Sequence, residues 1–135
     1  MKYKDKIYII EDDANILSGL TANLRCLGYE IGCDSGNESM ENVLTNLKVH
    51  QPNYIILDLI LPKIDGFKLL HRIKADEAFC KCPVIVFTDF SESDFKTRSL
   101  KIGADYFFVK TDFRIDEFVE KVNKIINNRK KNRVF

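Results

Sequence analysis

Short apolar runs alternate along the chain with longer segments in which apolar residues recur every three or four positions. A short, continuously apolar run is typical of a strand that is buried on both faces of a sheet. Such runs follow one another at regular intervals and end at polar or turn residues. We therefore predict five strands, at Ile7–Ile10, Tyr29–Cys33, Tyr54–Asp58, Val84–Thr88 and Tyr106–Val109.

Helical periodicity fills the segments between and after these runs. Gly28 stands where the first helix should stop, and Gly103 where the fourth should. The fourth helix has a thin apolar face, and Ser91 with Asp94 resembles a capping box at its start. Five strands alternating with five helices predict an α/β fold, with a doubly wound parallel sheet covered on both faces. Periodicity alone leaves the strand order open.

Length and composition fit one ordinary globular domain. The chain has 135 residues, 45% of them hydrophobic, and a net charge of +1, so no global field draws it to nucleic acid or membrane. The basic residues 129–133 favour a solvated helix end over a nucleic-acid patch. No apolar run is long enough for a signal peptide or a membrane span. Cys26 and Cys33 are interpreted as small core residues, and reduced thiols favour a cytoplasmic location.

The polar residues that end the predicted strands are the strongest indication of function. Glu11 and Asp12 follow the first strand, Asp58 ends the third, Thr88 the fourth, and Lys110 follows the fifth. In an open parallel sheet the carboxyl ends of the strands form one edge, and ligands bind there. These side chains are therefore expected to lie together.

The residue types at this edge suit one kind of chemistry. Neighbouring carboxylates repel one another and call for a cation, and an all-oxygen set favours a hard ion such as Mg²⁺. An aspartate beside such an ion can attack phosphorus and become an acyl phosphate. A hydroxyl and an ammonium group would stabilise the transferred oxygens. The edge is therefore predicted to carry out phosphoryl transfer.

The motifs at these positions resemble the receiver domains of two-component response regulators. Glu11-Asp12, the segment Leu57–Gly66, Thr88 and the segment Gly103–Lys110 carry the resemblance, which covers nearly the whole chain. It implies a flavodoxin-like (β/α)5 fold with strand order 2-1-3-4-5, as in the chemotaxis response regulator. We also expect one receiver domain over residues 1–135 and no output domain, since none fits in the residues after the fifth helix; a stand-alone receiver and a receiver excised from a longer regulator or hybrid kinase both stay open.

Several roles follow from the resemblance by position. Asp58 would be the phosphoacceptor. Asp12 and the backbone carbonyl of Ile60 would be Mg²⁺ ligands together with Asp58, and Glu11 would act mostly through water. Asp13, by contrast, is better explained as a helix N-cap than as a ligand. The metal set expected is thus Glu11, Asp12, Asp58 and Ile60.

The resemblance also assigns a switch. Thr88 and Lys110 would contact the phosphoryl oxygens, and Phe107 matches the aromatic switch position. Thr111 stands where a proline is usual, which argues against the family's cis peptide there. Apolar Ile60 and Phe90 flank the site and predict slow hydrolysis, the alternative being that both simply pack against neighbouring loops.

The function implied is a phosphorylation switch. A sensor histidine kinase or histidine phosphotransfer protein would phosphorylate Asp58, and the face formed by the fourth helix, fifth strand and fifth helix would change its affinity for a protein target. Direct binding of nucleic acid or membrane is not expected, and a phosphorylation-dependent dimer stays open. The alternative is a Mg²⁺-dependent phosphohydrolase with an aspartate nucleophile. That class needs a general acid where Ile60 stands, which disfavours it.

Overall fold

The computed structural model describes residues 5–132. Five strands alternate with five α-helices, and one 3₁₀ turn, η1, precedes the last helix. In chain order the elements are β1 (Lys6–Ile10), α1 (Ala14–Cys26), β2 (Glu30–Asp34), α2 (Met40–His50), β3 (Tyr54–Leu57), α3 (Gly66–Ala75), β4 (Val84–Thr88), α4 (Ser93–Ile102), β5 (Tyr106–Val109), η1 (Lys110–Asp112) and α5 (Ile115–Lys131).

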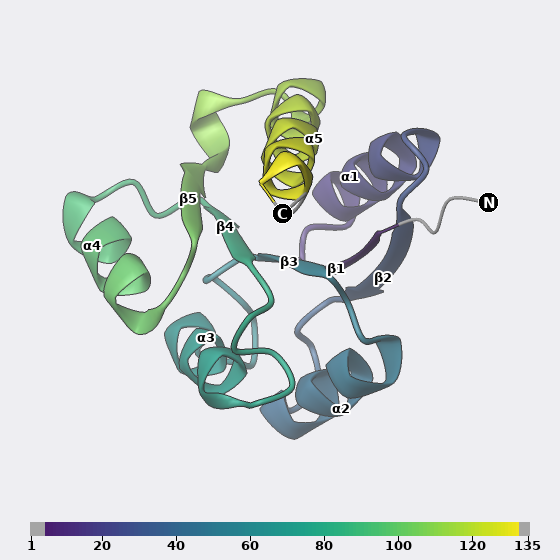
Figure 1. Ribbon diagram of the computed structural model, residues 1–135. Helices are drawn as coiled ribbons and strands as arrows, with labels where there is room; N and C mark the ends of the chain where they lie inside the picture. Colours follow the sequence, from purple (N-terminus) through teal and green to yellow (C-terminus); the bar gives the residue numbers. More distant parts are fainter. Residues whose placement is uncertain (1–4, 133–135) are drawn as a thin grey trace.

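The strands form a single parallel sheet in the order β2-β1-β3-β4-β5 (Figure 1). This order confirms both the α/β class and the flavodoxin-like topology expected from the sequence. The three central strands have almost no exposed residue, which is why their sequences are continuously apolar. β2 and β5 form the two edges and are only partly buried.

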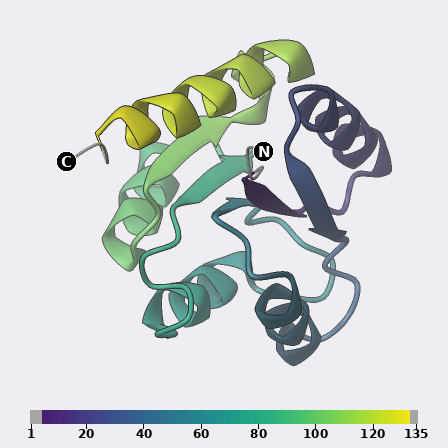
Figure 2. The same cartoon turned by 45° about the vertical axis from the view of Figure 1, so that its right-hand side comes forward.

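Helices cover both faces of the sheet, as Figures 1 and 2 show: α1 and α5 lie on one face, and α2, α3 and α4 on the other. Each face has its own hydrophobic core. Alternate residues of a strand point to opposite faces, so neighbouring apolar residues supply different cores. Ile9 packs with α1 and α5, for example, whereas Ile10 packs with α2 and α3.

The helix ends agree with the sequence at the glycines but not at the start of α4. Gly28 and Gly103 have positive φ angles of 96° and 131° just past α1 and α4, as predicted for helix stops. The capping box predicted at Ser91 is wrong. The N-cap of α4 is Glu92, and no side chain caps this helix.

The structure bears on four further expectations. Cys26 and Cys33 are exposed rather than buried in a core, because Cys26 lies off the inward face of α1 and Cys33 is on the edge strand β2. No peptide bond within residues 5–132 is cis, so the bond before Thr111 is trans. No helix in this range is both long and apolar enough to cross a membrane. Of the basic residues 129–133, Arg133 lies outside the described residues.

Candidate functional site

The predicted functional residues meet at the carboxyl edge of the sheet. Glu11 and Asp58 immediately follow β1 and β3, Thr88 is the last residue of β4, and Lys110 is the first residue after β5. Because the strands are parallel and in register, these four positions lie along one edge. The side chains of Glu11, Asp58 and Thr88 are buried, with at most 2% of each residue exposed.

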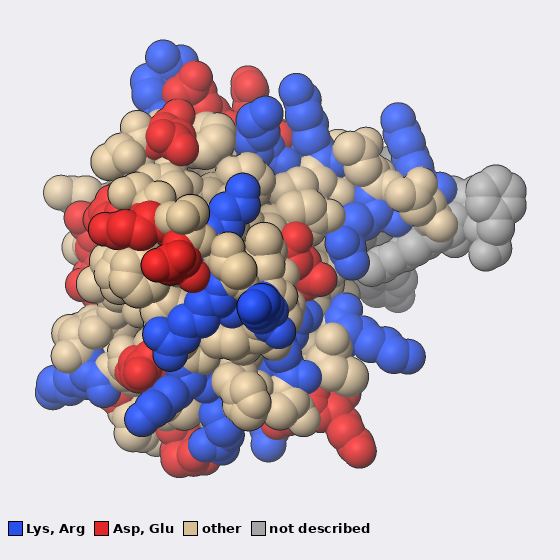
Figure 3. All heavy atoms as spheres, turned by 90° about the vertical axis from the view of Figure 1, so that its left-hand side faces the viewer, with Lys and Arg blue, Asp and Glu red and all other residues tan. Residues whose placement is uncertain are grey.

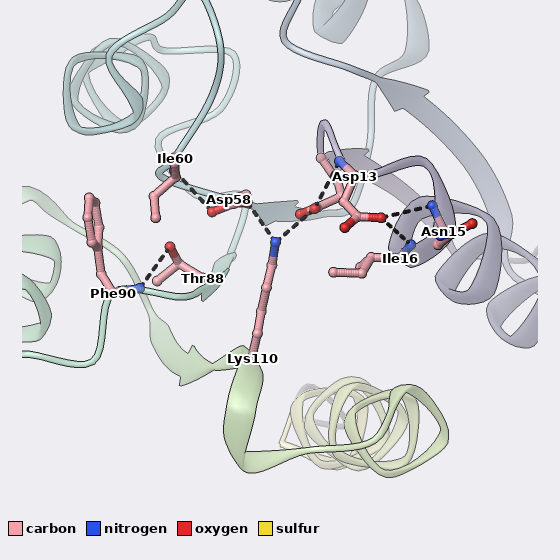
Figure 4. Close-up of polar contacts among 9 residues, drawn as sticks. Asp13, Asn15, Ile16, Asp58, Ile60, Thr88, Phe90 and Lys110 are labelled. Atoms are coloured by element: carbon pink, nitrogen blue, oxygen red, sulfur yellow. Dashed lines mark hydrogen bonds and ion pairs between the residues drawn. The ribbon is translucent and has the colours of Figure 1, made fainter.

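Lys110 joins the two buried carboxylates (Figure 4). Its Nζ atom lies 2.8 Å from Oε1 of Glu11 and 2.7 Å from Oδ2 of Asp58. Only 8% of the lysine side chain is exposed, against 2% for Glu11 and 3% for Asp58. One buried ammonium group thus serves two buried carboxylates, and these charges interact strongly because water is excluded from around them.

Burial and charge shift the proton equilibria of this group. Burial raises the pKa of Glu11 to about 7; the negative charge of Asp58 adds to this effect, and Lys110 opposes it. Burial alone would lower the pKa of Lys110, but hydrogen bonds to Asp58 and Glu11, with their charges, outweigh it and raise the pKa. Lys110 is therefore held in its charged form as an internal counterion.

A third carboxylate completes an acidic cluster. Glu11, Asp12 and Asp58 each offer one oxygen, and these oxygens all lie within 4.8 Å of one another. Asp12 is exposed, so it lies at the solvent side of the cluster while the other two form its buried wall. Carboxylate oxygens from two strand ends suit a hard divalent ion such as Mg²⁺, which keeps several waters and takes few protein ligands. The donor set thus fits the ion predicted from the sequence.

The loop after β3 holds the second oxygen of Asp58. The backbone N–H of Ile60 donates to Oδ1 of Asp58 at 3.0 Å (Figure 4), and Ile60 forms an isolated antiparallel bridge with Asp65. Gly66 allows this tight return, because a Cβ atom at that position would overlap the backbone of Leu59. Both oxygens of Asp58 therefore have a defined partner, one the ammonium group of a long side chain and the other a backbone N–H group.

Two acids beside the site cap helices, as predicted for Asp13. Asp13 caps α1, its Oδ1 accepting from the N–H groups of Asn15 and Ile16 at 2.9 and 3.1 Å (Figure 4). The backbone N–H of Asp13 also donates to Oε1 of Glu11 at 3.2 Å. Asp65 caps α3 in the same way. Asp13 thus fixes the chain direction after β1, which positions its two acidic neighbours.

Thr88 connects the site to a group of aromatic residues. Its Oγ1 accepts a hydrogen bond from the N–H of Phe90 at 3.4 Å (Figure 4). The ring of Phe90 stacks on Phe95 of α4, with centroids 4.3 Å apart, and both stack on Phe67 of α3. Phe107 is half-buried and packs against the same core. Phe90 thus packs against helices α3 and α4 rather than against loops, whereas Ile60 is 42% exposed, so the alternative that both side chains pack against neighbouring loops does not hold.

The sequence did not indicate this aromatic cluster of Phe67, Phe90 and Phe95. Its members come from α3, from the loop after β4 and from α4, so no single periodicity joins them. The one local indication of the cluster was the spacing of Phe90 and Phe95, which lie five positions apart on either side of the start of α4. Nor did the sequence predict that Lys110 would pair with both Glu11 and Asp58.

Comparison with known proteins identifies the class. Residues 7–123 match the model of the response regulator receiver domain family, and the chain belongs to this family. It is 31% identical over 121 residues to the "DNA-binding dual master transcriptional regulator RpaA" of Synechocystis sp., covering 90% of this chain and 48% of that protein.

Solved structures share the fold. The signal receiver domain of the DNA-binding response regulator protein merR from Colwellia psychrerythraea 34H is 26% identical, with a TM-score of 0.80 over 92% of this chain and 99% of that one. The Mn²⁺-bound form of response regulator Rcp1 is 22% identical, with a TM-score of 0.75 over 87% and 91% of the two chains. The chain spans about half the length of the curated relatives it matches.

Proposed function

We propose that this receiver domain accepts a phosphoryl group on Asp58 with the help of Mg²⁺, and that the modified site changes the affinity of the domain for a protein partner. The observation that carries the proposal is the buried Asp58, paired with Lys110 and flanked by Glu11 and Asp12 at the carboxyl edge of the sheet. A structural ion pair would need no further carboxylates, whereas a phosphoryl acceptor needs a cation site beside its nucleophile.

The metal site would use the acidic cluster. Asp12 and Asp58 would be direct ligands together with the backbone carbonyl of Ile60, and Glu11 would hold water ligands. When bound, Mg²⁺ would neutralise charge on the transferring oxygens and offset the repulsion among the carboxylates. The Mn²⁺-bound form of Rcp1, which has the same fold, supports a divalent ion in this class of domain.

The two contacts of Asp58 indicate which oxygen attacks. Oδ1 is held by the backbone N–H of Ile60, whereas Oδ2 is held by the ammonium group at the end of the long side chain of Lys110. We assign the attack to Oδ2, because Lys110 can leave it and follow the incoming phosphoryl oxygens. An electron pair of Oδ2 forms the new bond to phosphorus, and the phosphorus–nitrogen bond of a phosphohistidine breaks. Its electron pair stays on the leaving imidazole.

The buried hydroxyl of Thr88 would then report the new charge. Its present partner is the backbone N–H of Phe90, and its own proton is available to a phosphoryl oxygen. Movement of Thr88 toward that oxygen would make room for Phe107 and alter the surface of α4, β5 and α5. The domain would act as a switch, with slow loss of the phosphoryl group as its only turnover.

The partners belong to this proposal too. The donor would be a sensor histidine kinase or a histidine phosphotransfer protein, and the target a protein not identified by the sequence. RpaA is named as DNA-binding, and this chain matches about half of it. In this chain the absence of direct nucleic-acid and membrane contacts stays a prediction, as do a cytoplasmic location and the extent of the receiver over residues 1–135.

Phosphorylation by a small donor tests the proposal. With acetyl phosphate or phosphoramidate and Mg²⁺, intact-mass spectrometry should show one added phosphoryl group. Asp58→Asn or EDTA should abolish it. Asp13→Asn is the matched control, since it changes a nearby acid but keeps a capping residue. Labelling that persists in Asp58→Asn would refute the proposal.

A further inference from the structure

A groove runs between α3 and α4, on the face of the sheet opposite to α1 and α5. It consists of two adjoining hollows, of about 470 and 640 Å³, that share His71, Arg98 and Ile102. Residues of α3 form one wall and residues of α4 the other. Both hollows open to solvent, so side chains of another protein can enter them.

The floor of the groove is apolar, and its aromatic ring is packed against others. It includes Met40, Phe67 and Ile102. The guanidinium carbon of Arg98 lies 4.0 Å from the centroid of the Phe67 ring, in cation–π geometry. Phe67 is in turn stacked on the rings of Phe90 and Phe95. Arg98 is thus held over a rigid aromatic base, so little side-chain entropy is lost when it binds an anion.

The rim of the groove has an excess of unpaired positive charge. Lys68, Arg98 and Lys101 line it, and none of the three makes an ion pair with any of residues 5–132. Arg72 also lines it but is bound by Glu41 at 3.0 Å. Against these cations, Asp94 is the one acid in the lining of the two hollows. Figure 3 views the molecule from the α4 side and shows Lys and Arg atoms gathered across the lower part of this face.

The chemistry of the groove selects among anionic partners. A nucleic-acid backbone carries evenly spaced charge and would meet the acids Asp94 and Glu41 beside the cations. It would also leave the apolar floor unused. A peptide can place an apolar side chain on the floor and carboxylates beside Lys68, Arg98 and Lys101, with Arg98 able to bind a carboxylate through two nitrogens.

We propose that the groove between α3 and α4 is a docking site for an acidic segment of a partner protein, in which Asp and Glu residues flank an apolar anchor. The anchor rests on Phe67 and Ile102, and the carboxylates pair with Arg98, Lys68 and Lys101. The proposal does not depend on phosphorylation of Asp58, and its failure would leave the proposed function intact.

Selection from a random peptide library tests this site. The full chain is immobilised at physiological salt, and enriched peptides are synthesised with a fluorescent label for anisotropy. The enriched sequences should contain carboxylates around an apolar residue. Arg98→Glu/Lys101→Glu should weaken their binding by about tenfold or more, because two attractive charges become repulsive.

Two further variants keep this test decisive. Lys68→Glu/Lys101→Glu leaves the contact between Arg98 and Phe67 in place and should weaken binding similarly. Arg25→Glu/Lys81→Glu makes the same change of net charge at exposed residues outside both the groove and the face of α4, β5 and α5, and should bind as wild type does. Circular dichroism checks that each variant folds.

Several results would overturn the proposal. One is the failure to enrich any acidic peptide. Another is binding by the groove variants as tight as that of wild type. A third is weakening in the Arg25→Glu/Lys81→Glu control equal to that in the groove variants. The occupant would instead be a second copy if sedimentation shows self-association that the groove variants abolish. It would be a nucleic acid if a labelled oligonucleotide binds and is released by the same substitutions.

Discussion

Replacing Lys110 by methionine removes the one cation that serves two buried carboxylates. The Nζ atom lies 2.8 Å from Glu11 and 2.7 Å from Asp58, and all three side chains are at most 8% exposed. Methionine keeps most of the length and the apolar stem of lysine. The variant therefore tests the charge with little change of packing.

The magnitude follows from the burial of this pair. Removing one partner of a buried ion pair costs about 3–5 kcal/mol, because the other charge is left unpaired. For a domain of this size each kcal/mol moves the melting temperature by about 4 °C, so Lys110→Met should melt about 12–20 °C lower in EDTA. Mg²⁺ should restore more stability to the variant than it adds to wild type, because the ion replaces the missing counterion.

Urea unfolding in EDTA, followed by circular dichroism, measures this loss. The slope of the free energy of unfolding against urea should not change, since the buried area is the same. Lys48→Met is the control: its ion pair with Asp76 spans 3.6 Å, with 60% and 26% of the side chains exposed, and should contribute about 0–1 kcal/mol. If Lys110→Met is as stable as Lys48→Met, the buried counterion does not support the fold.

Three other outcomes are expected. Asp12→Ala should raise the free energy of unfolding in EDTA slightly, by under about 1 kcal/mol because Asp12 is exposed, and should abolish the rise in melting temperature with Mg²⁺. A Mg²⁺-dependent rise that remains would exclude Asp12 as a ligand. Gly66→Ala should lower the free energy of unfolding, measured in urea, by about 1–3 kcal/mol, because the new Cβ atom would overlap the backbone of Leu59. A variant as stable as wild type would contradict the tight approach of the loop. After removal of the donor, wild type should lose its phosphoryl group slowly. Ile60→Asn/Phe90→Glu should lose it faster, because the new polar side chains help to place the attacking water. An equal or longer lifetime of the phosphoryl group in the variant would show that these side chains do not set that lifetime.

The sequence predicted the fold where one physical signal dominates. Burial on both faces makes β3 and β4 continuously apolar, and their predicted bounds match the structure to within one residue. The parallel order of such strands then places Asp58 and Thr88 at a common edge. Edge strand β2 was predicted one residue early, because a half-buried strand has a weaker pattern.

Other features depend on contacts between distant segments. Nothing local distinguishes Lys110 from a solvated lysine, yet the fold buries it between two carboxylates. The stack of Phe90 on Phe95 and Phe67 arises only when α3 packs beside α4. The start of α4 was mispredicted because its N-cap, Glu92, makes no side-chain bond that a sequence motif could reveal.

Chemical mapping of the phosphorylated residue tests the central claim most directly. After labelling with acetyl phosphate and Mg²⁺, borohydride reduces an aspartyl phosphate to homoserine, which tandem mass spectrometry locates in the sequence. We expect homoserine at position 58 alone, and none when EDTA is present during labelling. Homoserine at another aspartate, or a stable phosphoryl group that borohydride leaves unchanged, would contradict the assignment of Asp58 as the phosphoacceptor.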